Sequence, residues 1–519
     1  MATHAPAAWP ARRAGSATIA RRAAFIVLLA ATPLVGHVSS NRFDFPAVNG
    51  FWALPLFGAL MLLPLVVGAR PRLRHLDLLV LLSFLVALGC ERPDRSWPVL
   101  LIYPPLVYLC ARMVAIARTG RNEKSHVLSP PIRPALPRSW LVVGIVVLAC
   151  VHVSWALEGS GGSDVATGGV RGASAILHGR PIYGVPGRAV ALDPHTDTYG
   201  PVDYEAYVPF VALSAGSLSA KVTTLFFDLL TGLLLFALGR RLRGASAGVL
   251  LAYCWLAFPF TLYEDALGFN DSIVAAALIG TLLVARSPAR RGVMAAVAAF
   301  TKLSPLALVP LLATHPPAGG RVTRRSVSAF AAAFALATAV VFAPVLVHGS
   351  VGAFFSRSFG FQAHRTPALS VWAVLQGNYS VHAAWVGSAS RVLHGLLAAL
   401  AGAFVILVAR MARRGGVVPL AAVCAAVLIA LQVCLSYYSF SYILWFAPLV
   451  LSVLLLDGSS GEHPPRREQT GWAAGLTPRR RPPQREDGAP RFPRAGSRHA
   501  RRGRPGPVGA AAARSPRSA

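Results

Sequence analysis

Carboxylates are scarce in this sequence, and nearly half of them gather in two stretches. Of the 20 aspartates and glutamates in the 519-residue chain, nine lie in residues 158–205 and 264–271. They are Glu158, Asp164, Asp193, Asp197, Asp203, Glu205, Glu264, Asp265 and Asp271. A positioned carboxylate can act as a general base that takes a proton from an attacking hydroxyl group. These stretches are the first candidates for catalysis; the alternative is that acidic residues simply collect in external loops.

Asp164 is the strongest candidate for such a base. Apolar residues recur after it at helical spacing: Val170, Ala173, Ile176 and Leu177. This pattern predicts a short amphipathic helix in the membrane interface that stops near Gly179. The helix would hold Asp164 over a membrane-embedded substrate. The alternative is that Asp164 only caps the helix.

Basic and intramembrane residues are further candidates. His364 and Arg365 lie in a predicted external loop, and the forked donors of arginine suit phosphate oxygens. An ordinary solvated cation is the alternative. Lys302 and Asp228 fall within apolar segments, where an ionisable group indicates function. Asp228 shares one helix face with Lys221. Pairing with a neighbouring helix is the alternative for Asp228.

The composition indicates a membrane protein. Hydrophobic residues make up 55% of the chain and charged residues only 13%, whereas a soluble protein is nearer 25% charged. The net charge of +30 could suggest nucleic acid, but the basic residues lie mostly in short loops and one tail. We therefore expect a lipid bilayer and no nucleic acid as partner.

The apolar runs predict an all-α, polytopic transmembrane bundle of about 12 spans plus re-entrant or short helices. The predicted spans are Ala23–Val38, Gly50–Ala69, Leu76–Cys90, Trp97–Ala117, Ser139–Leu157, Val222–Gly239, Ala247–Tyr263, Ser272–Ala285, Val327–Val347, Ala383–Ala409, Val417–Ser436 and Tyr442–Leu456. The first could instead be a signal peptide; without a clean cleavage site, an uncleaved anchor is favoured.

The basic clusters set the expected orientation. By the positive-inside rule, Arg70–His75, Arg112–Arg138, Arg240–Arg243, Arg286–Arg291 and Arg410–Arg414 are cytoplasmic. Alternation then places the loop 158–205 and the shorter loops 264–271 and 348–367 outside. Gly292–Ala313 has basic residues on both sides, so two short helices with a break near Lys302–Pro305 fit better than a single crossing.

Three parts are expected along the chain. They are a four-span leader over residues 1–138, a multi-span catalytic body over 139–456 with the large external loop 158–205, and a disordered, basic cytoplasmic tail over 457–519.

None of the six cysteines forms a CxxC pair or a metal-ligand spacing. We expect no metal and no cofactor.

Several short strings occur in a characteristic order. They are Ser163-Asp164-Val165, Gly172-Ala173, Ile176 to Tyr183, Tyr199-Gly200-Pro201, Asn270-Asp271, Lys302 with Pro305, and Tyr442–Pro448 with Trp445. Together they resemble glycosyltransferase family 87, and the resemblance covers about residues 139–456. The chain departs from the family in its four leading spans, its basic tail and the Val165-Ala166-Thr167-Gly168 string, where many relatives have an aromatic residue.

This resemblance implies a GT-C-like fold and a membrane glycosyltransferase. Its relatives include transferases that move mannose or arabinose from a polyprenyl phosphate to envelope glycans or glycolipids outside the cell. Asp164 then occupies the place of the catalytic base. His364 and Arg365, chosen for their chemistry, and Lys302 are the candidates for binding the donor phosphate. Tyr183, Tyr199, Asn270 and Asp271 would bind substrate, although Asn270-Asp271 could instead cap a helix.

The expected function is therefore an inverting hexosyl- or pentosyltransferase in the plasma membrane, with its active site on the external side. Its partners would be a polyprenyl-phosphate sugar, an envelope glycan or glycolipid acceptor, and the bilayer. The main alternative is a transporter or flippase for a lipid-linked sugar, although no paired inverted halves are visible. A non-catalytic scaffold that recruits partners through the tail is a further alternative.

Overall fold

The computed structural model describes most of the chain before residue 457. The described residues are 19–32, 50–66, 72–90, 97–119, 134–158, 162–184, 197–214, 216–317, 320–349, 351–365, 367–375, 384–412 and 416–456. The predicted tail and the candidate carboxylate Asp193 lie outside them.

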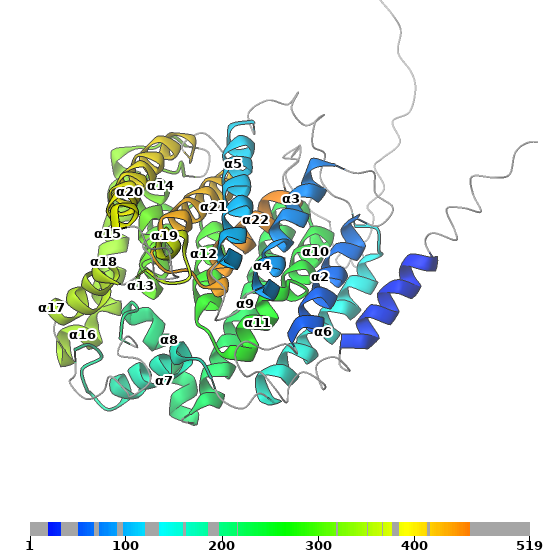
Figure 1. Cartoon of the computed structure of the whole chain (residues 1–519), viewed down its shortest axis with the longest axis horizontal. Helices are drawn as coiled ribbons and strands as arrows, with labels where there is room; N and C mark the ends of the chain where they lie inside the picture. The colour runs from blue at the N-terminus through cyan, green and yellow to red at the C-terminus, as the bar shows by residue number, and fades with distance from the viewer. Residues whose placement is uncertain are drawn as a thin grey trace, which may run out of the picture. The chain divides into compact units, whose positions relative to one another are not determined.

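The described residues form helices and no strand, with one isolated bridge between Ala368 and Tyr437 (Figure 1). The longer helices are α2 (Gly50–Val66), α3 (Leu73–Leu82), α5 (Tyr103–Thr119), α6 (Arg138–Glu158), α7 (Asp164–Leu177), α8 (Pro201–Leu213), α9 (Ser217–Arg243), α10 (Ala245–Leu256), α11 (Pro259–Leu267), α12 (Asp271–Leu283), α13 (Pro288–Thr301), α15 (Arg324–Val341), α20 (Ala384–Ala412), α21 (Val417–Cys434) and α22 (Ile443–Leu456). The shorter ones are α4 (Phe84–Cys90), η2 (Trp97–Ile102), η4 (Ser304–Leu308), α14 (Val309–Ala313), α16 (Ala343–His348), α17 (Val351–Phe355), η5 (Ser356–Gly360), α18 (Phe361–His364), α19 (Val371–Leu375) and η6 (Phe440–Tyr442).

Seven of these helical segments are long and apolar enough to cross a membrane, or eight if α10 and α11, bent by 52°, make one broken span. The seven are Leu73–Cys90, Pro98–Arg118, Arg138–Leu157, Ser217–Arg243, Arg324–Val341, Ala389–Met411 and Val417–Cys434. The predicted polytopic helical bundle is confirmed.

The predicted count of about 12 spans is not confirmed. Three of the predicted spans are apolar helices of 17 residues or fewer: Ala53–Val66, Asp271–Leu283 and Phe440–Leu456. At about 1.5 Å per residue such helices fall short of a hydrocarbon core about 30 Å thick. They are packed inside the bundle, where hydropathy resembles that of a span.

The apolar core is continuous across the boundary predicted at residue 138. Helix α5 packs against α21, and α3 contacts α22. The buried Arg74 donates from Nη1 to the carbonyl of Leu454 at 3.0 Å, and the Tyr253 hydroxyl donates to the carbonyl of Leu60 at 2.7 Å. The helices of the predicted leader and body therefore share one interior.

The segment from Pro288 to Ala313 is broken where the sequence predicted. Helix α13 ends at Thr301, Lys302 has extended backbone, and Pro305 lies in the first turn of η4. The Arg291 guanidinium donates from Nη2 to the carbonyl of His315 at 2.8 Å, so the two ends of the segment meet. This confirms the predicted hairpin and places Lys302 at its tip.

Candidate active site

Lys302 is enclosed by one carboxylate and three aromatic rings. Its ammonium group pairs with Asp271 Oδ1. Nζ lies 5.1 Å from the ring centroid of Tyr199, 5.4 Å from that of Tyr442 and 5.6 Å from that of Trp445. Lysine over aromatic faces gains cation–π attraction. With only 5% of its surface exposed, Lys302 supplies a fixed positive charge beneath these rings.

Asp271 is held by groups from three other segments. Besides Lys302, the indole N–H of Trp445 donates to Oδ1 of Asp271 at 2.5 Å. The first turn of its helix is capped by Glu264, whose Oε1 accepts the backbone N–H groups of Asp271 and Ser272. Asn270, at the N-cap position, makes no side-chain capping hydrogen bond. Asn270 is therefore the N-cap residue, as the alternative interpretation predicted, but its side chain does not form the capping bond, and the Asp271 carboxylate pairs with Lys302.

Tyr199 reaches Lys302 because Gly200 fits tightly against the hairpin. The backbone N–H of Gly200 donates to the carbonyl of Thr301 at 3.1 Å. A Cβ atom at residue 200 would lie 1.9 Å from the Phe300 carbonyl oxygen, so only glycine fits. Pro201 then begins α8 with a fixed φ. The Tyr199-Gly200-Pro201 string is thus the contact that brings the ring of residue 199 over Lys302.

Asp164 is an exposed carboxylate at the first residue of α7. The N-cap residue of the helix is Ser163, whose Oγ accepts the N–H of Ala166 at 3.1 Å, and Asp164 follows it in the first turn. Ser163 also donates its backbone N–H to the carbonyl of Leu267 at 3.0 Å, which ties this end of α7 to α11. The Asp164 carboxylate acts electrostatically on the hydroxyl groups of Tyr199 and Tyr442. Asp164 is therefore electrostatically coupled to two of the three aromatic side chains that enclose Lys302.

Helix α7 is the predicted amphipathic helix, and its inner face packs closely on α8 (Figure 1). Gly169 lies against the ring of Tyr207 and Gly172 against the ring of Tyr204, with no room at either position for a side chain. Gly179 follows the helix with a left-handed φ of 61°, which agrees with the predicted stop. Close packing on α8 fixes the direction from which Asp164 is presented.

The Arg365 side chain lies beside the hydroxyl group of Tyr442. Its guanidinium carbon is 3.6 Å from the ring centroid of Tyr437 and 5.2 Å from that of Phe361, and the cation acts electrostatically on the Tyr442 hydroxyl. The neighbouring backbone is anchored because Ala368 N–H donates to the carbonyl of Ser436 at 3.0 Å. Tyr442 stacks on Trp445 with ring centroids 4.3 Å apart and so links Arg365, Asp164 and Lys302.

His364 and Tyr183 contact this cluster less directly. His364 is exposed, and its Nδ1 hydrogen-bonds the carbonyl of Gly360 in its own helical turn at 2.8 Å. Tyr183 is buried against Phe354, and its hydroxyl donates to the carbonyl of Tyr199 at 2.8 Å. The structure therefore gives Tyr183 a supporting position behind Tyr199.

Asp203 is a carboxylate of this region that sequence reasoning did not single out. It is fully buried on α8 beside Asn270, and burial raises its pKa to about 7; Lys302 and Asn270 lower the pKa, and Asp271 raises it. Its position two residues after Pro201, at the tight contact of Gly200 with the hairpin, was the sequence feature that could have identified it.

Asp197, in contrast, forms a two-pronged ion pair with Arg357, with Arg357 Nη2 to Asp197 Oδ1 at 2.6 Å.

One comparison with known proteins gave a match. The model of glycosyltransferase family 87 matches residues 198–436. The match includes Tyr199, Asn270, Asp271, Lys302 and Arg365, and begins after Asp164. Comparison with curated proteins and with solved structures gave no match. The predicted resemblance to glycosyltransferase family 87 is confirmed over residues 198–436, and together with the apolar helices it indicates a membrane glycosyltransferase.

Proposed function

We propose that the protein transfers a sugar from a polyprenyl-phosphate donor to an envelope glycan or glycolipid, on the external side of the plasma membrane. The observation that carries this proposal is the convergence on Tyr442 of one exposed carboxylate, Asp164, and two cations, Arg365 and Lys302. Sugar transfer from a lipid phosphate requires both kinds of group, a proton acceptor and a site for the anionic leaving group.

In this proposal Asp164 is the general base. Its exposure lets an acceptor hydroxyl approach, and its position at the start of α7 is fixed by the Ser163 contacts with α7 and α11. The hydroxyl attacks the anomeric carbon as Asp164 takes its proton. A single displacement of this kind inverts the anomeric centre.

The leaving phosphate is assigned to Arg365, with Lys302 behind it. Arg365 is half-buried, and its planar guanidinium can donate two parallel hydrogen bonds to phosphate oxygens. Lys302 is nearly buried and already paired with Asp271. It contributes a preorganised charge that needs no rearrangement during the reaction. We assign His364 no direct role.

The hydrophobic setting favours a lipid-linked donor. The cluster is built on the tip of the α13 hairpin and the start of α12, both inside an apolar bundle. No α/β nucleotide-binding fold occurs in the part of the chain that the structure describes. Mannose-like hexoses and arabinose are the proposed sugars, by the resemblance noted in the sequence.

The test is a donor competition with the full chain in lipid nanodiscs. A polyprenyl-phosphate sugar and the matching nucleotide sugar are each supplied with a mixed envelope acceptor extract. Transfer from the lipid donor is the expected result. Transfer from the nucleotide sugar alone would overturn the proposal. Movement of the lipid-linked sugar across a sealed vesicle, without transfer to the acceptor, would favour the flippase instead.

A further inference from the structure

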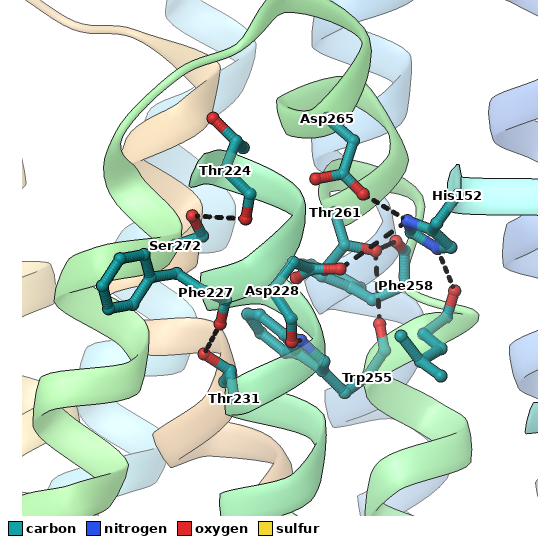
Figure 2. Close-up of polar contacts among 11 residues, drawn as sticks. His152, Thr224, Phe227, Asp228, Thr231, Trp255, Phe258, Thr261, Asp265 and Ser272 are labelled. Carbon is teal, nitrogen blue, oxygen red and sulfur yellow. Dashed lines mark hydrogen bonds and ion pairs between the residues drawn. The ribbon is translucent and has the colours of Figure 1, made fainter. Parts of the chain in front are cut away.

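Three titratable side chains from three helices meet in the interior of the bundle. They are His152 of α6, Asp228 of α9 and Asp265 of α11, and each is fully buried (Figure 2). His152 Nδ1 lies 2.6 Å from Asp265 Oδ2 and 3.6 Å from Asp228 Oδ2. One nitrogen or oxygen atom from each residue lies within 4.8 Å of the others. Asp228 thus pairs with a neighbouring helix, as the alternative interpretation of the sequence predicted.

The histidine is oriented as a ligand. Its Nε2 lies 2.9 Å from the carbonyl oxygen of Leu256, and a carbonyl can only accept, so Nε2 carries a proton. Nδ1 lies 2.6 Å from Asp265 Oδ2, a distance at which it donates a proton to that carboxylate. If an ion displaced this proton, Nδ1 would offer its lone pair between the two carboxylates. Metal-bound histidines commonly have this arrangement, in which a backbone carbonyl fixes the tautomer through the opposite ring nitrogen.

The two carboxylates are only partly compensated. Asp265 Oδ2 pairs with His152, but among the described residues Asp265 Oδ1 and both oxygens of Asp228 have no hydrogen-bond partner. The indole N–H of Trp255 donates to the backbone carbonyl of Asp228 at 3.0 Å, and the indole also acts on the Asp228 carboxylate. Within the described residues, the basic group that acts on either carboxylate is His152. A buried carboxylate without compensation is strongly unfavourable.

We propose that His152, Asp228 and Asp265 bind a divalent transition-metal ion such as Zn²⁺ or Mn²⁺. One imidazole nitrogen and up to four carboxylate oxygens form a donor set that suits these ions better than Mg²⁺ or Ca²⁺. Two positive charges balance the two carboxylates around a neutral histidine. The 3.6 Å separation of His152 and Asp228 atoms is near the roughly 3.4 Å between two ligands of a tetrahedral ion with bonds of about 2.1 Å. The Asp265 oxygen needs to retreat by less than about 1 Å.

The ion would position the active site without contacting it. It would fix α11 against α6 and α9. Helix α11 carries Glu264, which caps the helix of Asp271, and Leu267, whose carbonyl holds Ser163 beside Asp164. The proposal does not depend on the sugar, the donor or the acceptor.

The metal content of the full chain tests the proposal. The protein is purified in detergent with an affinity tag that contains no histidine, from cells grown separately with added Zn²⁺, Mn²⁺, Mg²⁺ or Ca²⁺. Elemental analysis should find about one Zn²⁺ or Mn²⁺ per chain. X-ray absorption should show a shell of nitrogen and oxygen with imidazole scattering. Asp228→Asn and His152→Asn should each lower the content at least tenfold, while Asp77→Asn, which alters a buried carboxylate paired with Arg112, should leave it unchanged.

Three results would overturn the site. One is wild-type protein free of Zn²⁺ and Mn²⁺ from every culture, which would mean that protons alone balance the cluster. Another is full metal content in Asp228→Asn. The third is a sulfur shell in the wild-type spectrum, which would place the ion on cysteine. The wild-type measurements decide the matter even if a variant fails to fold.

Discussion

Glu264 and Asp271 are joined through the first turn of α12. Oε1 of Glu264 accepts the backbone N–H of Asp271 at 2.5 Å and that of Ser272 at 3.0 Å. Because the cap comes from α11, the Asp271 side chain is left to bind Lys302 and Trp445. The charge environment of Lys302 therefore depends on a carboxylate from another helix.

Replacing Glu264 should show this dependence. Glu264→Ala removes the cap and should lower the free energy of unfolding by about 0.5–2 kcal/mol, with a parallel loss of sugar transfer. Glu264→Gln keeps an oxygen acceptor and should retain most of both. Thermal unfolding in detergent and a transfer assay check the two effects. An alanine variant as stable and active as wild type would mean that the cap has no role.

Removing the proposed base should slow the reaction and leave the fold intact. Asp164→Asn keeps the shape and loses the proton acceptor, so transfer should fall by roughly 10²–10⁴-fold, with donor binding near normal. Ser163→Ala is the matched control, because it loses the helix cap, worth about 1 kcal/mol, yet keeps the base. Wild-type turnover by Asp164→Asn would remove Asp164 from the mechanism and direct attention to Asp193, Asp197 or Asp271.

The proposed phosphate contact predicts a defect that depends on the donor. A hydrogen bond to a charged group contributes about 1.5–3 kcal/mol, so Arg365→Ala should lower kcat/KM for the lipid donor by about 10- to 150-fold. Arg365→Lys should recover part of the loss, since it keeps the charge without the forked donors. Arg180→Ala, at an exposed arginine near the end of α7, is the control and should behave as wild type. Equal kinetics of Arg365→Ala and wild type would exclude this contact.

Gly200 should tolerate no side chain. In Gly200→Ala the new methyl group would lie 1.9 Å from the Phe300 carbonyl oxygen, so Tyr199 must move away from Lys302. We expect a lower melting temperature and reduced transfer. Gly402→Ala, within α20 and with no atom within 4 Å of the added carbon, should be neutral or slightly stabilising. Similar behaviour of the two variants would contradict the tight fit at residue 200.

Asp203 should make stability depend on pH. Its pKa rises from 3.8 to about 7 on folding because burial disfavours the charged form. The folded chain then binds more protons than the unfolded chain between these values, so stability falls as pH rises through this window and levels off above about 7. In Asp203→Asn the melting temperature should depend less on pH between 5 and 7.5 than in wild type. Lys302, Asp271 and the Asn270 amide face the same group, so Asp271→Asn serves as a comparison. Parallel pH curves for wild type and Asp203→Asn would contradict the raised pKa.

The features that the sequence predicts correctly are those set by residues close together in the chain. Helical spacing predicted α7, and Pro305 within an apolar run predicted the break at Lys302. Asp271 and Lys302 were each recognised, but their pairing was not, since it joins residues 31 positions apart. The burial of Asp203 and the stacking of Tyr442 on Trp445 likewise arise only when distant segments pack.

The predicted number of spans is not confirmed by the described residues, and the physical reason is similar. Hydropathy cannot distinguish a helix that crosses lipid from a short apolar helix inside the protein. The length of α12 depends on where it begins, and that point is set by Glu264 from another helix. The cluster of His152, Asp228 and Asp265 was hidden because its members lie 76 and 37 positions apart, far from any familiar ligand spacing.

The hydrogen bond from Arg74 to the carbonyl of Leu454 bears on how such enzymes could be recombined. The family match covers residues 198–436, and Arg74 and Leu454 lie on either side of it in the sequence. Helix α5 packs on α21, and α22 packs on α12 and α21, within the matched region. A chimera that exchanged only this region would keep the bond between Arg74 and Leu454 but would set α5 and α22 against foreign helices. Exchange between relatives should therefore move the flanking helices together with the matched region, because the region recognised by sequence is smaller than the unit that folds.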